Sequence, residues 1–171
     1  MEEPIPENKS IKKSIIIAVI IFIFDAFWLN QGMIAFITLV IVILFFLPKA
    51  IYLHVKKLGP KPQYFKCLIY IVMAFCVFGS NYMNNKIAHS RAEALIHSIE
   101  QYKNEKGVFP DNLEALTPDY IKSVPLAKYT FMHNRYQYFL IEGKASMWYV
   151  AFPPFGKATY YFSSRQWAYY D

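Results

Sequence analysis

The sequence predicts an α+β fold, in which three transmembrane helices lead into a long helix packed on a small antiparallel sheet. Three observations lead to this prediction. The first half of the 171-residue chain contains three long apolar segments, the third segment passes into an amphipathic stretch, and the last third consists of short aromatic-rich runs between turn residues. The hydrophobic fraction of 56% also exceeds that of ordinary soluble domains.

The first two apolar segments are predicted to form a transmembrane hairpin over residues 14–53. Ser14 to Leu29 is apolar apart from Asp25, and Met33 to Leu47 is uncharged. Each approaches the roughly 20 residues that a spanning helix needs. Residues 30–32, Asn-Gln-Gly, supply a polar turn but are too few to cross a bilayer, so the two helices must be antiparallel.

A cleaved signal peptide is the alternative for the first segment. Signal peptides begin with a basic region and end at a small-x-small cleavage site. This chain instead begins with Glu2, Glu3 and Glu7, and residues 27–30 are Phe-Trp-Leu-Asn. We therefore expect the segment to be retained as a membrane helix.

Asp25 has two interpretations. A carboxylate inside a membrane segment often marks a proton or ion path. Asp25 lies close to the hairpin tip, however, beside Trp28, and no second acid, His or Arg stands opposite it in the apolar segments. We favour a carboxylate that interfacial water or a neighbouring polar group solvates.

The third apolar segment, Cys67 to Asn85, is predicted to be a transmembrane helix that continues into water. It runs into Lys86 to Lys106 with no helix breaker other than Gly79. In that second stretch the apolar residues follow a helical stripe, namely Ile87, Leu95, Ile96, Ile99 and Tyr102.

The distribution of lysines predicts the orientation. Residues 1–13 and the loop 54–66 are rich in Lys, and residues 1–85 carry eight Lys against four acids. Because cytoplasmic loops are enriched in basic residues, both regions are expected in the cytoplasm and residues 86–171 outside it. The bilayer is then one partner of the chain. The basic residues belong mainly to the membrane half, which disfavours nucleic acid as a partner.

The order of residues after the amphipathic stretch has a known counterpart. Gly107-Val108-Phe109-Pro110 ends the long helix, and a punctuated series follows, made of Leu113, Leu116, Pro118, Tyr120, Ile121, Val124 and Pro125. From about Ala88 to Pro125 this order resembles the type II secretion pseudopilins and type IV pilin-like proteins. The resemblance implies a pilin-like domain at the bacterial inner membrane, and other pilin-like or secretion-platform proteins as partners.

The chain also departs from that family. Gly59-Pro60-Lys61-Pro62 precedes the third segment, and no Gly-Phe pair with a following Glu stands before it, so we expect no cleavage by prepilin peptidase. The family's calcium site uses C-terminal carboxylates, whereas residues 129–171 contain only Glu142 and Asp171. Calcium prefers six to eight oxygen ligands. We therefore predict no metal and no cofactor.

Four short runs near the C-terminus are predicted to form an antiparallel meander. These are residues 136–141, 147–152, 158–162 and 166–170, separated by Glu142-Gly143-Lys144, Pro153-Pro154-Phe155-Gly156 and Ser163-Ser164-Arg165. Fifteen of the 43 residues from Tyr129 to Asp171 are aromatic, which suits a pleated surface packed on a helix.

No residue pattern in the chain indicates catalysis. Both cysteines lie in the third apolar segment, His89 and His97 are eight residues apart rather than four, and no nucleophile, zinc or phosphate-loop motif is present. We therefore expect a non-enzymatic protein. Its candidate partner-binding residues are Trp148, Trp167, Tyr169 and Tyr170, because a strand offers a second side that one helix leaves uncovered.

The resulting hypothesis is a multi-pass inner-membrane protein whose outer domain binds other proteins, in or beside a type II secretion or type IV pilus system. The alternative is a free-standing membrane sensor or accessory protein whose outer domain binds a small ligand or an envelope polymer. An enzyme ranks third.

Overall fold

A computed structural model describes residues 7–152 and 156–170, so that Pro153-Pro154-Phe155 of the predicted second turn and the acid Asp171 lie outside the described residues. The chain divides into two compact units, Met1–Asn81 and Tyr82–Asp171. The predicted α+β fold with a long helix and a four-stranded antiparallel sheet is confirmed.

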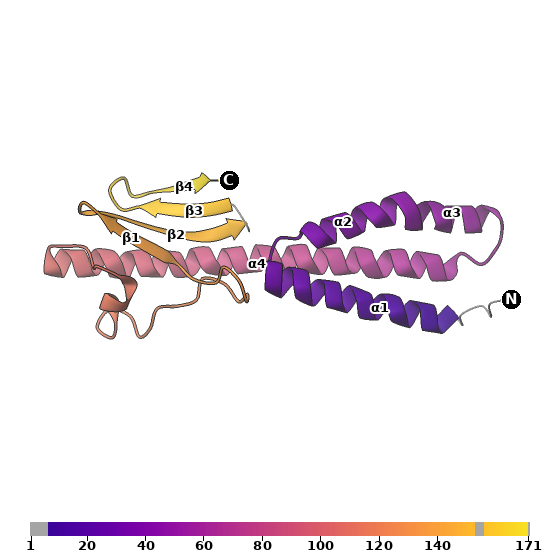
Figure 1. Ribbon diagram of the computed structural model, residues 1–171, viewed down its shortest axis with the longest axis horizontal. Coiled ribbons are helices and arrows are strands. Elements are labelled where there is room, and N and C mark those ends of the chain that lie inside the picture. Colours follow the sequence, from indigo (N-terminus) through magenta and orange to yellow (C-terminus); the bar gives the residue numbers. More distant parts are fainter. Residues whose placement is uncertain (1–6, 153–155, 171) are drawn as a thin grey trace. The chain divides into compact units, whose positions relative to one another are not determined.

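The first unit is helical (Figure 1). Its elements are α1 (Glu7–Ile23), the π-helical turn η1 (Phe24–Leu29), α2 (Met33–Ile41), the π-helical turn η2 (Val42–Phe46), α3 (Leu47–Val55) and the first part of α4 (Lys61–Lys106). Small side chains let these helices approach closely, since Ala18, Ala35 and Ala74 belong to one buried cluster with Tyr70 and Met73. Lys61 and Lys66 of the predicted loop lie on α4.

Two helices, rather than the three predicted, are long and apolar enough to span a membrane. They are Met33–Val55, with 23 residues, and Lys61–Lys106, with 46 residues. The first helix is not among them. The charge-free stretch between Lys13 and Asp25, Ser14 to Phe24, has only 11 residues. At 1.5 Å per residue it covers about half of the thickness of a hydrocarbon core.

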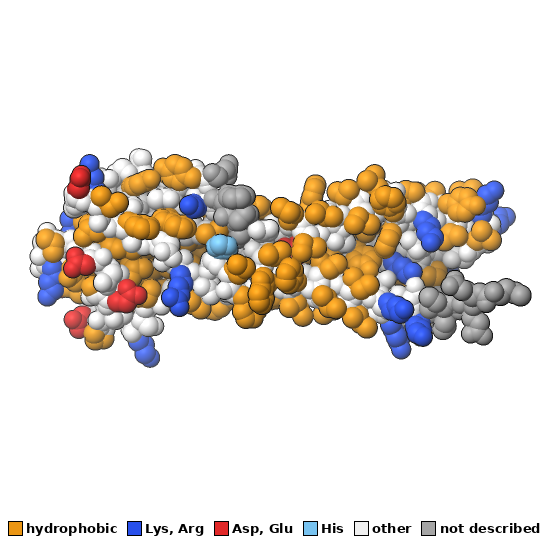
Figure 2. Space-filling model, in the orientation of Figure 1, with side chains coloured by type: hydrophobic (Ala, Val, Ile, Leu, Met, Phe, Trp, Pro, Cys, Tyr) orange, Lys and Arg blue, Asp and Glu red, His pale blue; other side chains and the backbone are white. Residues whose placement is uncertain are grey.

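The surface of the first unit is apolar. Large hydrophobic side chains are exposed along each of its helices, including Ile16, Phe36, Phe45, Leu68 and Phe75. Figure 2 shows apolar side chains over the visible side of the first unit, with Lys and Arg side chains gathered toward one of its ends. Such a surface is unfavourable in water and favourable in lipid.

Asp25 is fully buried, with an exposed fraction of 0%, and its partners are backbone amides. Its Oδ1 accepts a hydrogen bond from the N–H of Gly32 at 2.9 Å, and its Oδ2 accepts one from the N–H of Ala35 at 2.8 Å. These amides belong to the N-terminus of α2, where a negative charge is favoured and free N–H groups need partners. The carboxylate thus closes the hairpin, in agreement with its solvation by a neighbouring polar group.

Replacing Asp25 by Ala is expected to loosen the hairpin turn. The two N–H groups would lose their acceptor in a buried position, at a cost of about 1–3 kcal/mol each. Hydrogen exchange of the full chain in detergent micelles should therefore become much faster at Gly32 and Ala35. Thr38→Val is the control, because the Thr38 hydroxyl only donates to the carbonyl of Ile34, four residues before it on α2. Equal exchange in both variants would contradict the role assigned to Asp25.

In the second unit, the remainder of α4 carries the sheet on one side (Figure 1). The buried stripe of the helix consists of Ala88, Ala92, Leu95, Ile96 and Ile99. The predicted stripe is confirmed at Leu95, Ile96 and Ile99. Ala88 and Ala92 extend it, and their small side chains allow the sheet to come close to the helix.

The end of α4 follows the prediction. Gly107 adopts a positive φ of 79°, and its N–H donates to the carbonyl of Lys103 at 2.8 Å, which terminates the helix. The short helix that follows is the 3-10 turn η3 (Leu113–Leu116), and the Asn112 side chain caps it by accepting from the N–H of Ala115 at 3.0 Å.

Four strands form a meander in the order β1-β2-β3-β4 (Figure 1). They are β1 (Gln137–Ile141), β2 (Lys144–Phe152), β3 (Gly156–Tyr161) and β4 (Gln166–Tyr170), all paired antiparallel. β2 begins three residues and β3 two residues earlier than predicted, because pairing between neighbouring strands, rather than apolar content, decides where a ladder starts.

Candidate functional site

Alternation along the strands gives the sheet two different sides. One side faces α4, where Tyr138, Met147, Tyr160 and Trp167 follow one another across the four strands. Met147 and Tyr160 are buried in the core of the second unit, and Tyr138 and Trp167 pack against that core. This side therefore holds the sheet to the helix.

The opposite side, which we call the outer face, carries side chains that do not belong to the core cluster of the second unit, and among them Val150 and Thr159 are buried. Its aromatic residues are Phe139, Trp148, Tyr161 and Tyr170, with Phe139, Tyr161 and Tyr170 exposed. The Tyr161 and Tyr170 hydroxyls lie 3.0 Å apart, and the Lys157 ammonium lies 4.6 Å from the centre of the Trp148 ring. The contacts orient large, partly apolar side chains outward.

The four predicted binding residues divide between the two sides. Trp148 and Tyr170 lie on the outer face. Trp167 lies on the side that faces α4, where its Nε1 donates to the Glu93 carboxylate at 2.9 Å. Tyr169 pairs with the buried Ala158 and shares that side, although it is exposed at the edge of the sheet.

Two aromatic residues of the outer face, Phe139 and Tyr161, were missed by the sequence reasoning. Alternation along each strand was the available signal. Phe139 is two residues from Ile141 and so shares its side, whereas Tyr161 follows the buried Tyr160 and so points to the opposite side. Pairing of Phe139 with Ser146, and of Ser146 with Tyr161, brings them to one row, and that register is not visible in a single strand.

The charged residues of the outer face are basic. None of the four strands contains Asp or Glu, whereas Lys144 and Lys157 both stand on the outer face. A partner with acidic and apolar groups would be attracted electrostatically and would find aromatic contacts.

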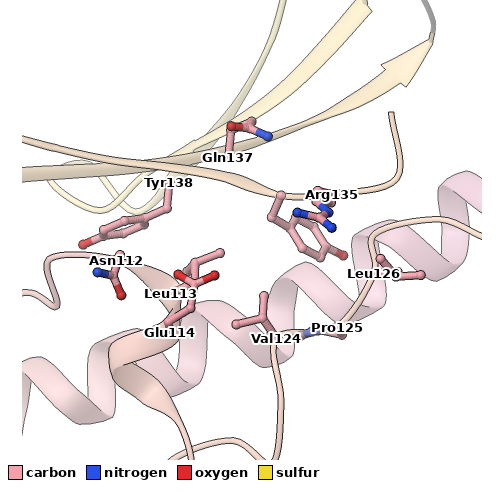
Figure 3. A pocket seen from close by; sticks show the side chains of 10 residues that line it. Asn112, Leu113, Glu114, Val124, Pro125, Leu126, Arg135, Gln137 and Tyr138 are labelled. Atoms are coloured by element: carbon pink, nitrogen blue, oxygen red, sulfur yellow. The ribbon is translucent and has the colours of Figure 1, made fainter. Parts of the chain in front are cut away.

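A separate pocket of about 490 Å³ lies beside the start of β1 (Figure 3). Arg135 and Gln137 contribute from the strand side, and Asn112, Leu113 and Glu114 from the side of η3. Arg135 and Glu114 form no ion pair within the described residues, so that the pocket presents one cation and one anion.

The Tyr138 side chain also lines this pocket. Its hydroxyl is buried and has no hydrogen-bond partner among the described residues. Burial, assisted by the nearby Asp111 carboxylate, raises the pKa of Tyr138 to about 12, so the hydroxyl stays protonated at neutral pH.

No group of three His, Cys, Asp or Glu side chains in residues 7–152 and 156–170 is arranged to hold a metal ion. His89 instead contacts the Trp167 ring, with ring centres 5.0 Å apart, and its Nε2 lies 3.6 Å from the Glu93 carboxylate. His97 is exposed on α4.

No protein-family model, curated protein or solved structure matches this chain. The likeness to pilin-like proteins therefore stays a prediction from the sequence.

Lys128 is a buried cation that the sequence did not reveal. Its side chain has an exposed fraction of 0%, and its ammonium group donates to the carbonyl of Ala151 at 2.8 Å. Burial lowers the pKa of Lys128 to about 8, because the charged form loses its hydration. The side chain fixes the segment before β1 to the end of β2.

The stability of the second unit is expected to rise with pH because of Lys128. Its pKa is about 8 when folded and has its ordinary value near 10.5 when unfolded, so the unfolded chain binds more protons between these values. From about pH 7 to pH 9.5 the free energy of unfolding should increase by roughly 2 kcal/mol. The unfolding temperature of the full chain in detergent, followed by near-ultraviolet circular dichroism, measures this change.

The control for this prediction is a lysine that is exposed. Lys122→Met should keep the rise with pH, and Lys128→Met should lose it. The measurement stops below pH 10 because burial raises the pKa of Tyr149 to about 12, and ionisation of such tyrosines lowers stability at higher pH. A rise of the same size in Lys128→Met would show that another group is responsible.

Proposed function

We propose that this chain is a non-enzymatic, multi-pass protein of the bacterial inner membrane that presents a pilin-like domain outside the cytoplasm for docking to other proteins. The docking takes place in or beside a type II secretion or type IV pilus system. The outer face of the sheet is the observation that carries this proposal, since it exposes aromatic side chains that the domain's own core does not use.

The composition of the outer face supports docking to a protein. Trp and Tyr are the usual anchors of interface energy, and they lose little conformational entropy on binding. Trp148 stands at the middle of the face and is partly buried under Lys157, whereas Tyr170 is at its edge. Lys144 and Lys157 favour a partner surface that contains acidic groups.

Three spans and an outward domain complete the proposal. Met33–Val55 and Lys61–Lys106 supply two of the spans. The α1 and η1 segment is proposed as the third, because the amides at the start of α2 take Asp25 out of contact with lipid. Lys56 and Lys57 lie in the connection between α3 and α4, and by the positive-inside rule they support a cytoplasmic connection.

The orientation can be tested with single cysteines in a chain whose Cys67 and Cys76 have been replaced by Ser. In intact spheroplasts a cysteine at Lys57 should be protected from an impermeant maleimide, and one at Lys144 should be labelled, because the reagent reaches only the outer side of the membrane. Labelled product is measured by mass. Labelling at Lys57 and protection at Lys144 would place the sheet in the cytoplasm and overturn the proposal.

Docking can be tested by crosslinking in the membrane followed by capture of the full chain. Trp148→Ala and Tyr170→Ala are expected to reduce capture of an acidic partner several-fold, since loss of an interface anchor costs about 2 kcal/mol or more. Capture is measured relative to the amount of folded chain, so that a variant that fails to fold is recognised.

Two further variants identify the surface that docks. Val108→Ala removes an exposed apolar side chain outside the sheet and should have no effect. Tyr169→Ala changes a residue on the other side of β4, so a loss there would show that the partner uses the edge strand rather than the outer face. Unchanged capture by Trp148→Ala and Tyr170→Ala would contradict docking through the outer face.

The pocket beside β1 favours a second function, a membrane sensor that binds a small ligand. Its uncompensated Arg135 and Glu114 suit a ligand with one carboxylate and one ammonium group. If the wild-type chain captures no protein, and its unfolding temperature rises with such a zwitterion but not in Arg135→Gln, the sensor function replaces docking.

A further inference from the structure

The segment Leu126 to Met132, which we call the apolar loop, exposes several hydrophobic side chains before β1. Tyr129 has an exposed fraction of 57% and Phe131 one of 71%, and Leu126 and Met132 are also exposed. A single exposed hydrophobic residue is ordinary, but four within seven residues form an exposed apolar patch.

The apolar loop is fastened to the beginning of the amphipathic part of α4. The N–H of Tyr129 donates to the Asn84 side-chain oxygen at 3.3 Å. Arg91 donates through Nη1 to the carbonyl of Leu126 at 2.7 Å and through Nη2 to the Tyr129 hydroxyl, and its guanidinium carbon lies 4.4 Å from the centre of the Tyr129 ring. The loop is therefore held at a fixed level along the helix, near Asn84.

The conformation of the loop keeps its polar groups inside. The Thr130 hydroxyl donates to the carbonyl of Met132 at 2.8 Å, and Asn134 donates from its side chain to the carbonyl of Thr130 at 2.9 Å. The N–H of Ala127 donates to the carbonyl of Asn134 at 2.7 Å, and Lys128 is buried. The apolar side chains are exposed because the polar groups occupy the interior, not because the loop lacks structure.

The level of Asn84 along α4 coincides with an end of the uncharged stretch. Cys67 to Asn85 comprises 19 residues between Lys66 and Lys86. At 1.5 Å per residue it measures about 28 Å, close to the roughly 30 Å of a hydrocarbon core. Asn84 then lies at the boundary between the acyl chains and the headgroups, where aromatic residues gather in membrane proteins.

Charge on this part of the chain is compatible with lipid headgroups. Residues 120–134 contain no Asp or Glu; Lys122 and His133 of this segment are exposed, and Lys86 is exposed on α4 at the level of Asn84. Anionic phospholipids are attracted to such a surface, while an acidic loop would be repelled.

We propose that the apolar loop lies in the interfacial region of the bilayer that α4 spans, with Tyr129, Phe131 and Met132 in contact with the headgroups and upper acyl chains. The lipid surface is thus a second attachment of the domain, besides the helix. This inference rests on the proposed membrane insertion of α4, and it assigns to the loop a role that the outer face of the sheet does not have.

The test uses the full chain in nanodiscs of phosphatidylcholine and phosphatidylglycerol, with Cys67 and Cys76 replaced by Ser. An environment-sensitive fluorophore is attached to one new cysteine at a time, and lipids with a nitroxide near the headgroup serve as quenchers. In Phe131→Cys we expect a blue-shifted emission and a loss of intensity with the nitroxide lipid. In Phe139→Cys, on the outer face, we expect neither.

A third position separates the two proposals. Phe75→Cys places the fluorophore on the exposed side of the uncharged stretch of α4, where a nitroxide deep in the acyl chains should quench it. Quenching at Phe75 without quenching at Phe131 would overturn the loop proposal and leave the membrane span intact. No quenching at Phe75 would overturn the span and the loop proposal together.

Two further outcomes of the quenching experiment also bear on the loop proposal. A blue shift at Phe131 without quenching would mean that protein, such as a second copy of the chain, covers the loop. Equal quenching at Phe131 and Phe139 would mean that the lipid contact is not specific to the apolar loop. Either result contradicts the proposal. Phe131→Ser is expected to weaken quenching of a fluorophore at Met132→Cys, because part of the apolar contact is lost.

Discussion

The structure depends on one helix, α4, whose side-chain pattern changes along its length. α4 is uncharged from Cys67 to Asn85, and from Ala88 onward it is apolar on one stripe. The sheet can pack only where the helix has a single apolar stripe and small residues on it, and Ala88 and Ala92 satisfy this at the first turns after the change. The domain therefore begins where the uncharged stretch ends, and Tyr136 reinforces this point because its hydroxyl donates to the carbonyl of Ala88 at 2.6 Å.

Much of this architecture was predictable, because it depends on patterns within short stretches of sequence. The continuity of α4 through Asn85, its end at Gly107 and the number of strands all follow from local rules for periodicity and turns, whereas its start at Lys61 lies within the predicted loop. The site was less predictable. Trp148 and Trp167 both stand in short runs with strand character but lie on opposite sides of the sheet, because each side is set by strand pairing and by contact with α4. Phe139 and Tyr161 join one row through Ser146, a relation among three strands that no single segment contains.

The two buried charges illustrate a second limit of sequence reasoning. Asp25 and Lys128 each stand among residues that give no sign of an opposite charge, and in both cases the partner is the backbone. Asp25 accepts two hydrogen bonds from backbone amides at the start of α2. Lys128 has one carbonyl, so burial outweighs the hydrogen bond and its pKa falls to about 8. The backbone of a distant segment is invisible in a sequence, and so are such partners.

Two groups of exposed apolar side chains on the second unit, the apolar loop and the outer face, differ in chemistry, and this difference argues for two partners. The apolar loop is fastened by Arg91 and Asn84 at the level where α4 becomes polar, and its side chains vary in shape, as a fluid lipid surface allows. The outer face has its aromatic rings in register on a rigid sheet, with Lys157 over Trp148. Ordered anchors of that kind suit a partner with a fixed surface. If the loop is taken up by lipid, the domain has less freedom to rotate about α4, and the outer face meets an incoming protein in one orientation, which lowers the entropy lost on docking.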